Sequence, residues 1–320
     1  MSVLVYVESW EGMFKKASFE AVSYARDLAA KSNDTLVTVC IGNISDTDSL
    51  GAYGAEKVIR VNDGSFHAFN NHSYATVLAE IAAKENAETI VISNTNNGKA
   101  IAPLLAVKHE AAMVSNVLEL PSNLAPFTVK RKAYSSKAFV NYSTENARKI
   151  IAITPNAIGV SESSANVAAE DYAATASDQR LSSVSVDKAS GKIPLPEAEL
   201  VISAGRGLKG PENWGMVEEL AELIGAGTAC SKPVSDMGWR PHSEHVGQTG
   251  IAINPELYIA IGISGAIQHL AGVNSSKNIV AINIDPEAPF FKAADYGIVG
   301  DAFEVVPKLI DAIKAFKAAN

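Results

Sequence analysis

Cysteine is scarce in this sequence, and its placement suggests neither disulfides nor a metal centre. The 320 residues include 2 cysteines, Cys40 and Cys230, which lie far apart and form no CxxC or metal-ligand spacing. A reduced compartment is the simpler explanation of this usage. The N-terminal segment lacks the basic flank, apolar core and small-residue cleavage site of a secretory signal. No apolar run approaches the roughly 20 residues that span a bilayer, so we expect a cytoplasmic protein that is not embedded in a membrane.

Basic charge is scarce as well. Lys and Arg number 27 against 35 Asp and Glu, which gives a net charge of −8, and no local basic run offsets the excess of acid. Such a surface repels phosphate backbones, so nucleic acid is not an expected partner. The chain is nevertheless 47% hydrophobic and long enough to bury the cores of two domains.

Strand-like and helix-like segments alternate through the first part of the chain. Strands are predicted at 2–8, 35–41, 58–61 and 89–93, and helices at 19–31 and 74–84. This alternation predicts a parallel sheet with helices on both faces. Residues 125–154 contain three strand-like runs without intervening helices, which we expect to complete the first domain as antiparallel additions.

A polar stretch separates the two halves of the chain. Residues 155–188 are rich in Ala, Ser, Asp and Glu, which predicts an extended, solvated crossing segment. We therefore place the domains at 1–188 and 189–320. The second domain has strands predicted at 199–203, 257–262, 278–283 and 296–299, and helices at 212–224, 266–271 and 302–318. The predicted fold class is α/β, with two open, mainly parallel sheets, the second doubly wound.

Ligands of such sheets bind outside the carboxyl ends of the strands, and the unusual residues of the second domain lie there. The loop 205–210 (GRGLKG) contains three glycines, together with Arg206, which could pair with a phosphate. Residues 263–270 (ISGAIQHL) expose N–H groups at a predicted helix start, which suits an anion. The loops 229–233 (ACSKP) and 246–250 (VGQTG) add hydroxyls, an amide and a lysine.

Each of these loops alone is as typical of a simple turn, and a lone histidine such as His269 is more often structural. Together they predict a polar site for a phosphate-bearing cofactor. The sequence shows no paired carboxylates placed for acid–base chemistry, no Ser-His-Asp or Cys-His set, and no metal-ligand spacing.

The segment PELYIAIGISGAIQHLAGVNSSKNIVAINIDPEAP, at 255–289, closely resembles the C-terminal signature of electron-transfer flavoprotein alpha subunits. The continuation FFKAADYGIVGD and the upstream GRGLK and VGQTG motifs resemble the same family at matching spacing. The resemblance is dense from Ser203 to the C-terminus. It is looser, but consistent in element order, over residues 1–188.

This resemblance implies that the second domain is an FAD-binding domain and that the first domain pairs with a smaller beta subunit. The heterodimer would carry electrons without substrate chemistry of its own. Its electrons would come from acyl-CoA or other flavin dehydrogenases, as in fatty acid beta-oxidation, and pass to an acceptor such as a membrane quinone oxidoreductase. AMP or a second FAD is expected on the beta subunit. By motif position, the implied cofactor-binding residues are Arg206, Ser231, Lys232, Val246, Gly247, Gln248, Thr249, Ser264, Gly265, Ala266, Ile267, Gln268, His269, Asn283, Asp301 and Ala302.

The resemblance also implies individual roles. Thr249 is expected near N5 of the flavin and His269 near its C2 carbonyl, where a positive or hydrogen-bonding group stabilises negative charge on the reduced ring. Asn283 and Asp301 would hold the adenosine end, although both would serve equally as loop or helix caps. At Lys232 the chain departs from the family, which usually has arginine there. Lysine keeps the charge but lacks the flat guanidinium, which puts the redox tuning in doubt.

Alternatives remain open at this point. The chain would also fit a subunit of an electron-bifurcating flavoprotein, in which the beta subunit holds a second flavin. An FAD- or NAD-linked oxidoreductase with its own substrate is less favoured, because no general base accompanies the loops. A sensory nucleotide-binding protein is ranked low, because the loops 8–12 and 42–46 lack a phosphate cradle.

Overall fold

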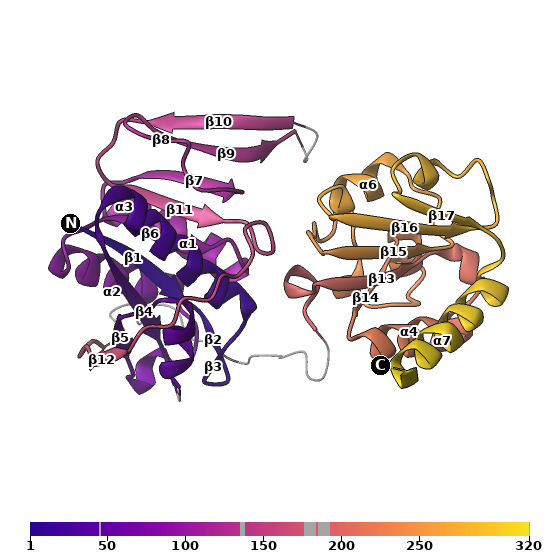
Figure 1. Ribbon diagram of the computed structural model, residues 1–320, viewed down its shortest axis with the longest axis horizontal. Helices are drawn as coiled ribbons and strands as arrows, with labels where there is room; N and C mark the ends of the chain where they lie inside the picture. The colour runs from indigo at the N-terminus through magenta and orange to yellow at the C-terminus, as the bar shows by residue number, and fades with distance from the viewer. Residues whose placement is uncertain (45, 135–137, 176–183, 185–192, 320) are drawn as a thin grey trace. The chain divides into compact units, whose positions relative to one another are not determined.

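A computed structural model describes residues 1–44, 46–134, 138–175, 184 and 193–319. The chain forms two compact units (Figure 1), one of Met1–Ala133 with Phe139–Asp187 and one that contains Lys188–Asn320. The predicted domain boundary at 188/189 lies outside the described residues. No helix in the described part of the chain is both long and apolar enough to cross a bilayer.

The first unit is built on one large sheet. Its strands are β1 (Ser2–Val7), β4 (Thr35–Ile41), β5 (Lys57–Val61), β6 (Ala87–Ser93), β7 (Ala112–Val117), β8 (Asn123–Leu124), β9 (Phe127–Ala133), β10 (Ala138–Thr144), β11 (Lys149–Ile153) and β12 (Ala168–Asp171). They are arranged in the order β10-β9-β7-β11-β6-β1-β4-β5-β12, with β8 beside β9. A short hairpin of β2 (Ser9–Trp10) and β3 (Met13–Phe14) follows β1. The strands from β11 to β5 pair in parallel.

Helices cover both faces of this sheet because its central strands are apolar on both sides. Val3 and Val5 of β1 pack in the core beneath α1 (Lys16–Ser32). Leu4 and Tyr6 pack in the opposite core, which also contains residues of α2 (Asn71–Lys84) and α3 (Asn96–Lys108). The α/β class predicted from the alternating segments is therefore confirmed for this unit.

One sequence prediction for this unit was wrong in detail. β11, expected as an antiparallel addition, pairs in parallel with both β6 and β7. The run from Ile150 to Ile153 is fully buried, as in an interior parallel strand. The crossing segment, expected to be extended and solvated, also adds the exposed strand β12 to the sheet, in parallel with β5, which the sequence did not predict. The pairing of β9 with β7 is antiparallel, as expected.

The segment after β11 is fixed on α1 by polar contacts. The carboxylate of Glu20, which is fully buried, accepts hydrogen bonds from the backbone N–H groups of Asn156, Ile158 and Gly159 at 2.8–2.9 Å. Burial raises the pKa of Glu20, and the three N–H groups oppose that rise. The buried carboxylate thus replaces the solvent that this stretch of backbone would otherwise need.

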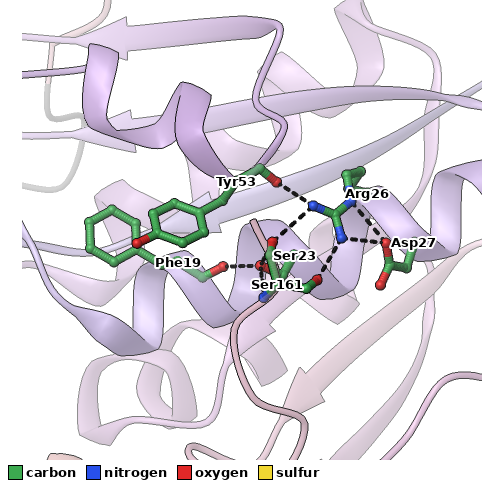
Figure 2. A network of polar contacts seen from close by, with 6 residues as sticks. All are labelled: Phe19, Ser23, Arg26, Asp27, Tyr53 and Ser161. Atoms are coloured by element: carbon green, nitrogen blue, oxygen red, sulfur yellow. Dashed lines mark hydrogen bonds and ion pairs between the residues drawn. The ribbon is translucent and has the colours of Figure 1, made fainter. Parts of the chain in front are cut away.

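Two turns further along α1, a second contact holds the same segment. Arg26 donates to the carbonyl oxygens of Tyr53 and Ser161, both at 3.0 Å, and to Ser161 Oγ at 2.6 Å (Figure 2). Its guanidinium also pairs with Asp27. Ser23 completes the network, because its hydroxyl accepts from the Ser161 N–H. The first part of the crossing segment is thus bound to the domain it leaves.

The second unit is a smaller, all-parallel sheet. Its strands are β13 (Leu200–Ala204), β14 (Gly227–Cys230), β15 (Leu257–Ile261), β16 (Asn278–Asn283) and β17 (Tyr296–Val299). They lie in the order β14-β13-β15-β16-β17, and every pair is parallel. After β13, the chain adds β14 on one side of it and then β15, β16 and β17 on the other side, as in a doubly wound sheet.

The two faces of this sheet carry different helices. Ile202, Ile261 and Ile282 pack in the core formed with α4 (Gly215–Ile224) and α7 (Ala302–Ala319). Val201 and Tyr258 point to the other face, in the core that includes the end of α6 (Ile267–Val273). Figure 1 shows α6 on the side of the sheet opposite α4 and α7. The order of the strands reverses between β13 and β15, which is where doubly wound sheets bind ligands.

Candidate functional site

A cleft of about 640 Å³ lies at the carboxyl ends of the strands of the second unit. It is formed by the loops after β13, β14, β15 and β16, and its position coincides with the reversal of strand order between β13 and β15. Its size falls within the range of roughly 300–1,000 Å³ that is usual for small-molecule and cofactor sites.

Most of the predicted cofactor-binding residues line this cleft. They are Arg206, Ser231, Lys232, Val246, Gly247, Gln248, Thr249, Ser264, Ala266, Gln268, His269 and Asn283. Four predicted residues do not line it: Gly265, Ile267, Asp301 and Ala302. The cleft also contains residues that the predicted set omitted, namely Gly205, Pro233, Asp236, His245, Gly262, Ile263, Asp285 and Ala288. Most of the omitted residues lie within or beside the recognised motifs, and this proximity was the signal that would have found them.

The glycines after β13 let two loops meet. A Cβ on Gly205 would lie 2.4 Å from the carbonyl oxygen of Gly262, and one on Gly207 would lie 2.6 Å from the Gly262 Cα. Gly262 itself has φ +60°, in the left-handed region. These three glycines thus bring the loops after β13 and β15 into contact at the switch point. From the sequence, the glycines of this loop were expected instead to let the backbone come close to a ligand.

Two of the residues outside the cleft have clear structural roles. Gly265 has φ +85°, and a Cβ there would lie 2.4 Å from the backbone nitrogen of Phe290, so it packs against the segment behind the cleft wall. Asp301 accepts a hydrogen bond from the Phe303 N–H at 3.0 Å at the start of α7. It also lies 3.6 Å from the ammonium of Lys209. Asp301 therefore caps the start of α7, which is one of the two roles expected for it from the sequence.

Asn283 both braces the loops and lines the cleft. Its Nδ2 donates to the carbonyl of Ile263 at 2.9 Å, and its Oδ1 accepts from the Asp285 N–H at 3.1 Å. The side chain therefore connects the loops that follow β15 and β16. Because both contacts use groups within the wall, the orientation of Asn283 is set before any ligand arrives.

The loop of residues 246–250 is held on its neighbours by main-chain contacts. The N–H of Val246 donates to the carbonyl of Cys230 at 3.1 Å, and the N–H of Gln248 donates to that of Gln268 at 2.7 Å. Gly272 of α6 lies so close that a Cβ on it would be 2.6 Å from the Gly247 Cα. The backbone of this loop is therefore fixed, while the side chains of Gln248 and Thr249 stay exposed in the cleft.

Two cations lie in the cleft without a partner among the described residues. Arg206 and Lys232 are exposed, and neither forms a hydrogen bond or an ion pair with a described residue. Asp236 and Asp285 also line the cleft, so the charge there has both signs. A guanidinium presents several donors in one plane and an ammonium is a compact charge, and both bind phosphate oxygens well.

Two buried histidines complete the cleft wall. Burial lowers the pKa of His245, with His242 and Lys232 adding to the effect. Burial, together with His245, lowers the pKa of His269 to about 4. Both rings are therefore neutral at physiological pH, and the Nδ1 atom of each is buried without a hydrogen-bond partner among the described residues. Buried polar atoms are normally paired, so these atoms fit a site that is completed by a ligand.

This donor set fits an organic cofactor with phosphate groups and a polar ring. Among the described residues, no group of three or more His, Cys, Asp and Glu side chains is placed to hold a metal ion. The free cations suit phosphate, while the neutral imidazoles, the amide of Gln248 and the hydroxyl of Thr249 suit the edge of a hydrogen-bonding heterocycle.

Comparison with known proteins gives matches over nearly the whole chain. Residues 3–179 match the electron transfer flavoprotein domain, and residues 194–274 match the electron transfer flavoprotein FAD-binding domain. The chain is 36% identical over 318 residues to electron transfer flavoprotein subunit alpha of Bacillus subtilis, a match that covers 98% of this chain and 97% of the relative.

Two further relatives belong to named enzyme systems. A lactate dehydrogenase (NAD(+),ferredoxin) subunit of Acetobacterium woodii is 32% identical over 321 residues, covering 98% of this chain and 77% of the relative. The acryloyl-CoA reductase electron transfer subunit beta of Anaerotignum propionicum is 32% identical over 354 residues, covering 99% and 96%. Given the two domain matches and the near-complete coverage, this chain belongs to the electron transfer flavoprotein alpha subunit family, and its second unit is an FAD-binding domain.

Proposed function

We propose that this chain is the FAD-carrying subunit of a heterodimeric electron carrier and that the cleft of the second unit holds the cofactor. The observation that carries the proposal is made in one cleft. Among the described residues, Arg206 and Lys232 have no partner there, and neither do the buried imidazole nitrogens beside them. FAD supplies one-electron and two-electron redox chemistry when bound.

The proposed roles are those that the family resemblance implies by motif position, for residues that line the cleft. Arg206 and Ser231 bind phosphate oxygens, and Ser264, Ala266 and Gln268 form the adjoining wall. Lys232, Val246, Gly247, Gln248, Thr249 and His269 surround the flavin ring. Asn283 holds the adenosine end from the loop after β16. For Gly265, Ile267, Asp301 and Ala302, a role in binding rests on motif position alone.

This arrangement supports a carrier more directly than an enzyme. Electron transfer asks the protein to bind a cofactor and to stabilise its charge, and it needs no nucleophile and no proton relay. The cleft offers fixed cations and neutral hydrogen-bonding rings, which meet that need. Mixing the purified protein with candidate reduced substrates, without any dehydrogenase, tests this point. Direct reduction by one of them would show that the protein is an enzyme.

The first unit supplies the surface for the partner in this proposal. The proposed partner is a smaller beta subunit that carries AMP or a second FAD. The edge strand β10 exposes 61% of Phe139 and 42% of Val140, a pair of apolar side chains that a partner would cover. The heterodimer would accept electrons from acyl-CoA or other flavin dehydrogenases, as in beta-oxidation, and pass them to a quinone oxidoreductase.

The site is tested by blocking it. Ala266 is exposed and lines the cleft, so Ala266→Trp should fill it and yield a folded heterodimer without FAD. Ala147→Trp, at an exposed position of the first unit, is the matched control and should retain one FAD on this chain. Stoichiometric FAD in the Ala266→Trp protein would place the cofactor elsewhere.

A second candidate function is a subunit of an electron-bifurcating complex. It is favoured by the similarity to a subunit of the Acetobacterium woodii lactate dehydrogenase that uses NAD(+) and ferredoxin. Counting flavin and AMP in the heterodimer, co-purified with the small subunit, distinguishes the two. One FAD with one AMP indicates a simple carrier, whereas two FAD and no AMP indicate the bifurcating type.

A further inference from the structure

A buried tyrosine contacts His269 from beneath the floor of the cleft. Tyr258 lies on the central strand β15 with no exposed surface, and its hydroxyl is 2.8 Å from Nε2 of His269, which is 7% exposed. The Tyr258 ring stacks on Phe290, with centroids 6.1 Å apart and planes at 14°. The His269 ring meets the same phenylalanine edge-on at 5.7 Å. Packing on Phe290 therefore holds the Tyr258 hydroxyl and the His269 imidazole in place relative to each other.

The proton between these two groups has one consistent position. Burial raises the pKa of Tyr258, so the phenol keeps its proton. The Ser203 hydroxyl is near enough to oppose that rise, but it forms no hydrogen bond within the described residues. The phenol therefore donates to Nε2 of His269. A neutral imidazole has one donor and one acceptor nitrogen, so an Nε2 that accepts leaves the hydrogen on Nδ1.

We propose that Tyr258 is a positioning residue that fixes His269 as the neutral Nδ1–H tautomer, so that His269 offers the flavin a directed hydrogen-bond donor and no positive charge. This rests on the proposed function, in which FAD occupies the cleft. Nδ1 of His269 is buried and forms no well-aligned hydrogen bond with a described residue, although the backbone of Val246 lies near enough to raise the imidazole pKa. The cofactor is the partner that the proposal assigns to Nδ1. The tautomer is set by a residue that does not line the cleft.

The groups around His269 support this division of roles. His245, which acts on His269 electrostatically, is itself buried and neutral. The cations that line the cleft are Arg206 and Lys232, and the anions are Asp236 and Asp285. In the proposed arrangement, positive charge for a reduced ring thus comes from Lys232, while His269 supplies a directed hydrogen-bond donor. Near neutral pH, uptake of an electron by the flavin would then not depend on protonation of His269.

The test uses Tyr258→Phe, which removes the hydroxyl and keeps the ring that stacks on Phe290. Tyr24→Phe is the matched control, because Tyr24 is 1% exposed and its hydroxyl donates to the Glu119 carbonyl at 3.4 Å in the first unit. The heterodimer is prepared with ¹⁵N-histidine in this chain, and His269→Gln assigns the signals of His269. Nitrogen shifts then report its tautomer with and without FAD.

We expect the Nδ1–H tautomer in the wild type and in Tyr24→Phe, and a mixture of tautomers in Tyr258→Phe. With FAD bound, Tyr258→Phe should reduce the equilibrium constant for uptake of the first electron about fivefold, the factor that one ordinary hydrogen bond supplies. An Nε2–H tautomer or an imidazolium in the wild type would overturn the proposal. An unchanged electron-uptake equilibrium in Tyr258→Phe would also overturn it. Because the tautomer is read in the apoprotein, this failure is distinct from misplacement of the cofactor, which Ala266→Trp reports.

Discussion

The two units share the α/β class, but two pairs of charged residues, one in each unit, differ in what they contact. In the first unit, Glu20 and Arg26 are paired with the chain's own backbone and hold the crossing segment on α1. In the second unit, Arg206 and Lys232 stand in a cleft with no partner among the described residues. Charges that are already paired serve stability, whereas charges without partners are available to a ligand. The comparison thus separates a scaffold from a binding site within one fold class.

The largest effect is expected at Glu20. Glu20→Ala leaves three backbone N–H groups, one buried and two partly buried, without their acceptor and should lower the free energy of unfolding by about 3 kcal/mol. The FAD content of the folded heterodimer should not change. Urea titration measures the loss, with Glu145→Ala, at an exposed position, as the control. Equal unfolding curves for the two variants would show that the contacts of Glu20 do not stabilise the first unit.

The two arginines give the sharpest form of the comparison. Arg206→Ala should weaken FAD binding by about 2 kcal/mol, the scale of a charged hydrogen bond, and leave the stability of the apoprotein unchanged. Arg26→Ala should do the reverse, costing about 1–2 kcal/mol of stability without changing the FAD dissociation constant. Flavin release measured by fluorescence, together with urea titration, gives both quantities for each variant. The contrast fails if either variant changes both quantities.

Lys232 tests whether an unpartnered cation tunes the cofactor. Positive charge beside the ring favours its reduced, negatively charged forms. Lys232→Ala should therefore lower the first one-electron potential, making uptake of that electron less favourable by about 1.5 kcal/mol, while FAD stays bound. Lys232→Arg should raise it, because a flat guanidinium loses less in forming its hydrogen bonds. Potentiometric titration decides, with Lys292→Ala outside the cleft as the control. One shared potential for all the proteins would mean that Lys232 points away from the flavin.

The smallest effect concerns the buried imidazole of His269. Burial holds its folded-state pKa at about 4, below the unfolded value of about 6.5. The unfolded chain therefore binds more protons, so the stability from this group is present above pH 6.5 and is lost as the pH falls towards 4. Between pH 8 and 5.5 the apoprotein should lose about 1 kcal/mol through His269. His269→Gln should reduce the slope of stability against pH, and an unchanged slope would contradict the burial argument.

The sequence was informative wherever a local pattern has one physical cause. Buried runs such as Thr35–Ile41 and Asn278–Asn283 were predicted at their observed bounds, because continuous β-branched residues suit a parallel strand. β7 was not predicted, since its run is interrupted by Asn116, which has φ +59°. β12 was missed because its residues are all exposed, so it carries no hydrophobic signal. α3, which contains Pro103, was not assigned either.

The motif loops of the second unit were located from the sequence, but the sequence did not tell which residues of each loop line the cleft. Gly265 and Ile267 adjoin Ser264 and Ala266 in the chain, yet only the latter two line the cleft. His245 lines it without belonging to any recognised motif. Position in a motif tells which loop approaches a site. The side on which each residue lies depends on the turn and on what packs behind it, as Phe290 does behind Gly265.

What the sequence determined by itself was the α/β class, the family and the loops that form the site, because these depend on residue types and spacing along the chain. The tertiary structure decided the position of β11, the pairing of Glu20 with residues far away in sequence, and the burial that keeps His269 neutral. It also decided the contact between Tyr258 and His269. Each of these depends on which groups meet across the fold and on how much water they lose there, and neither quantity is a property of a local stretch of chain.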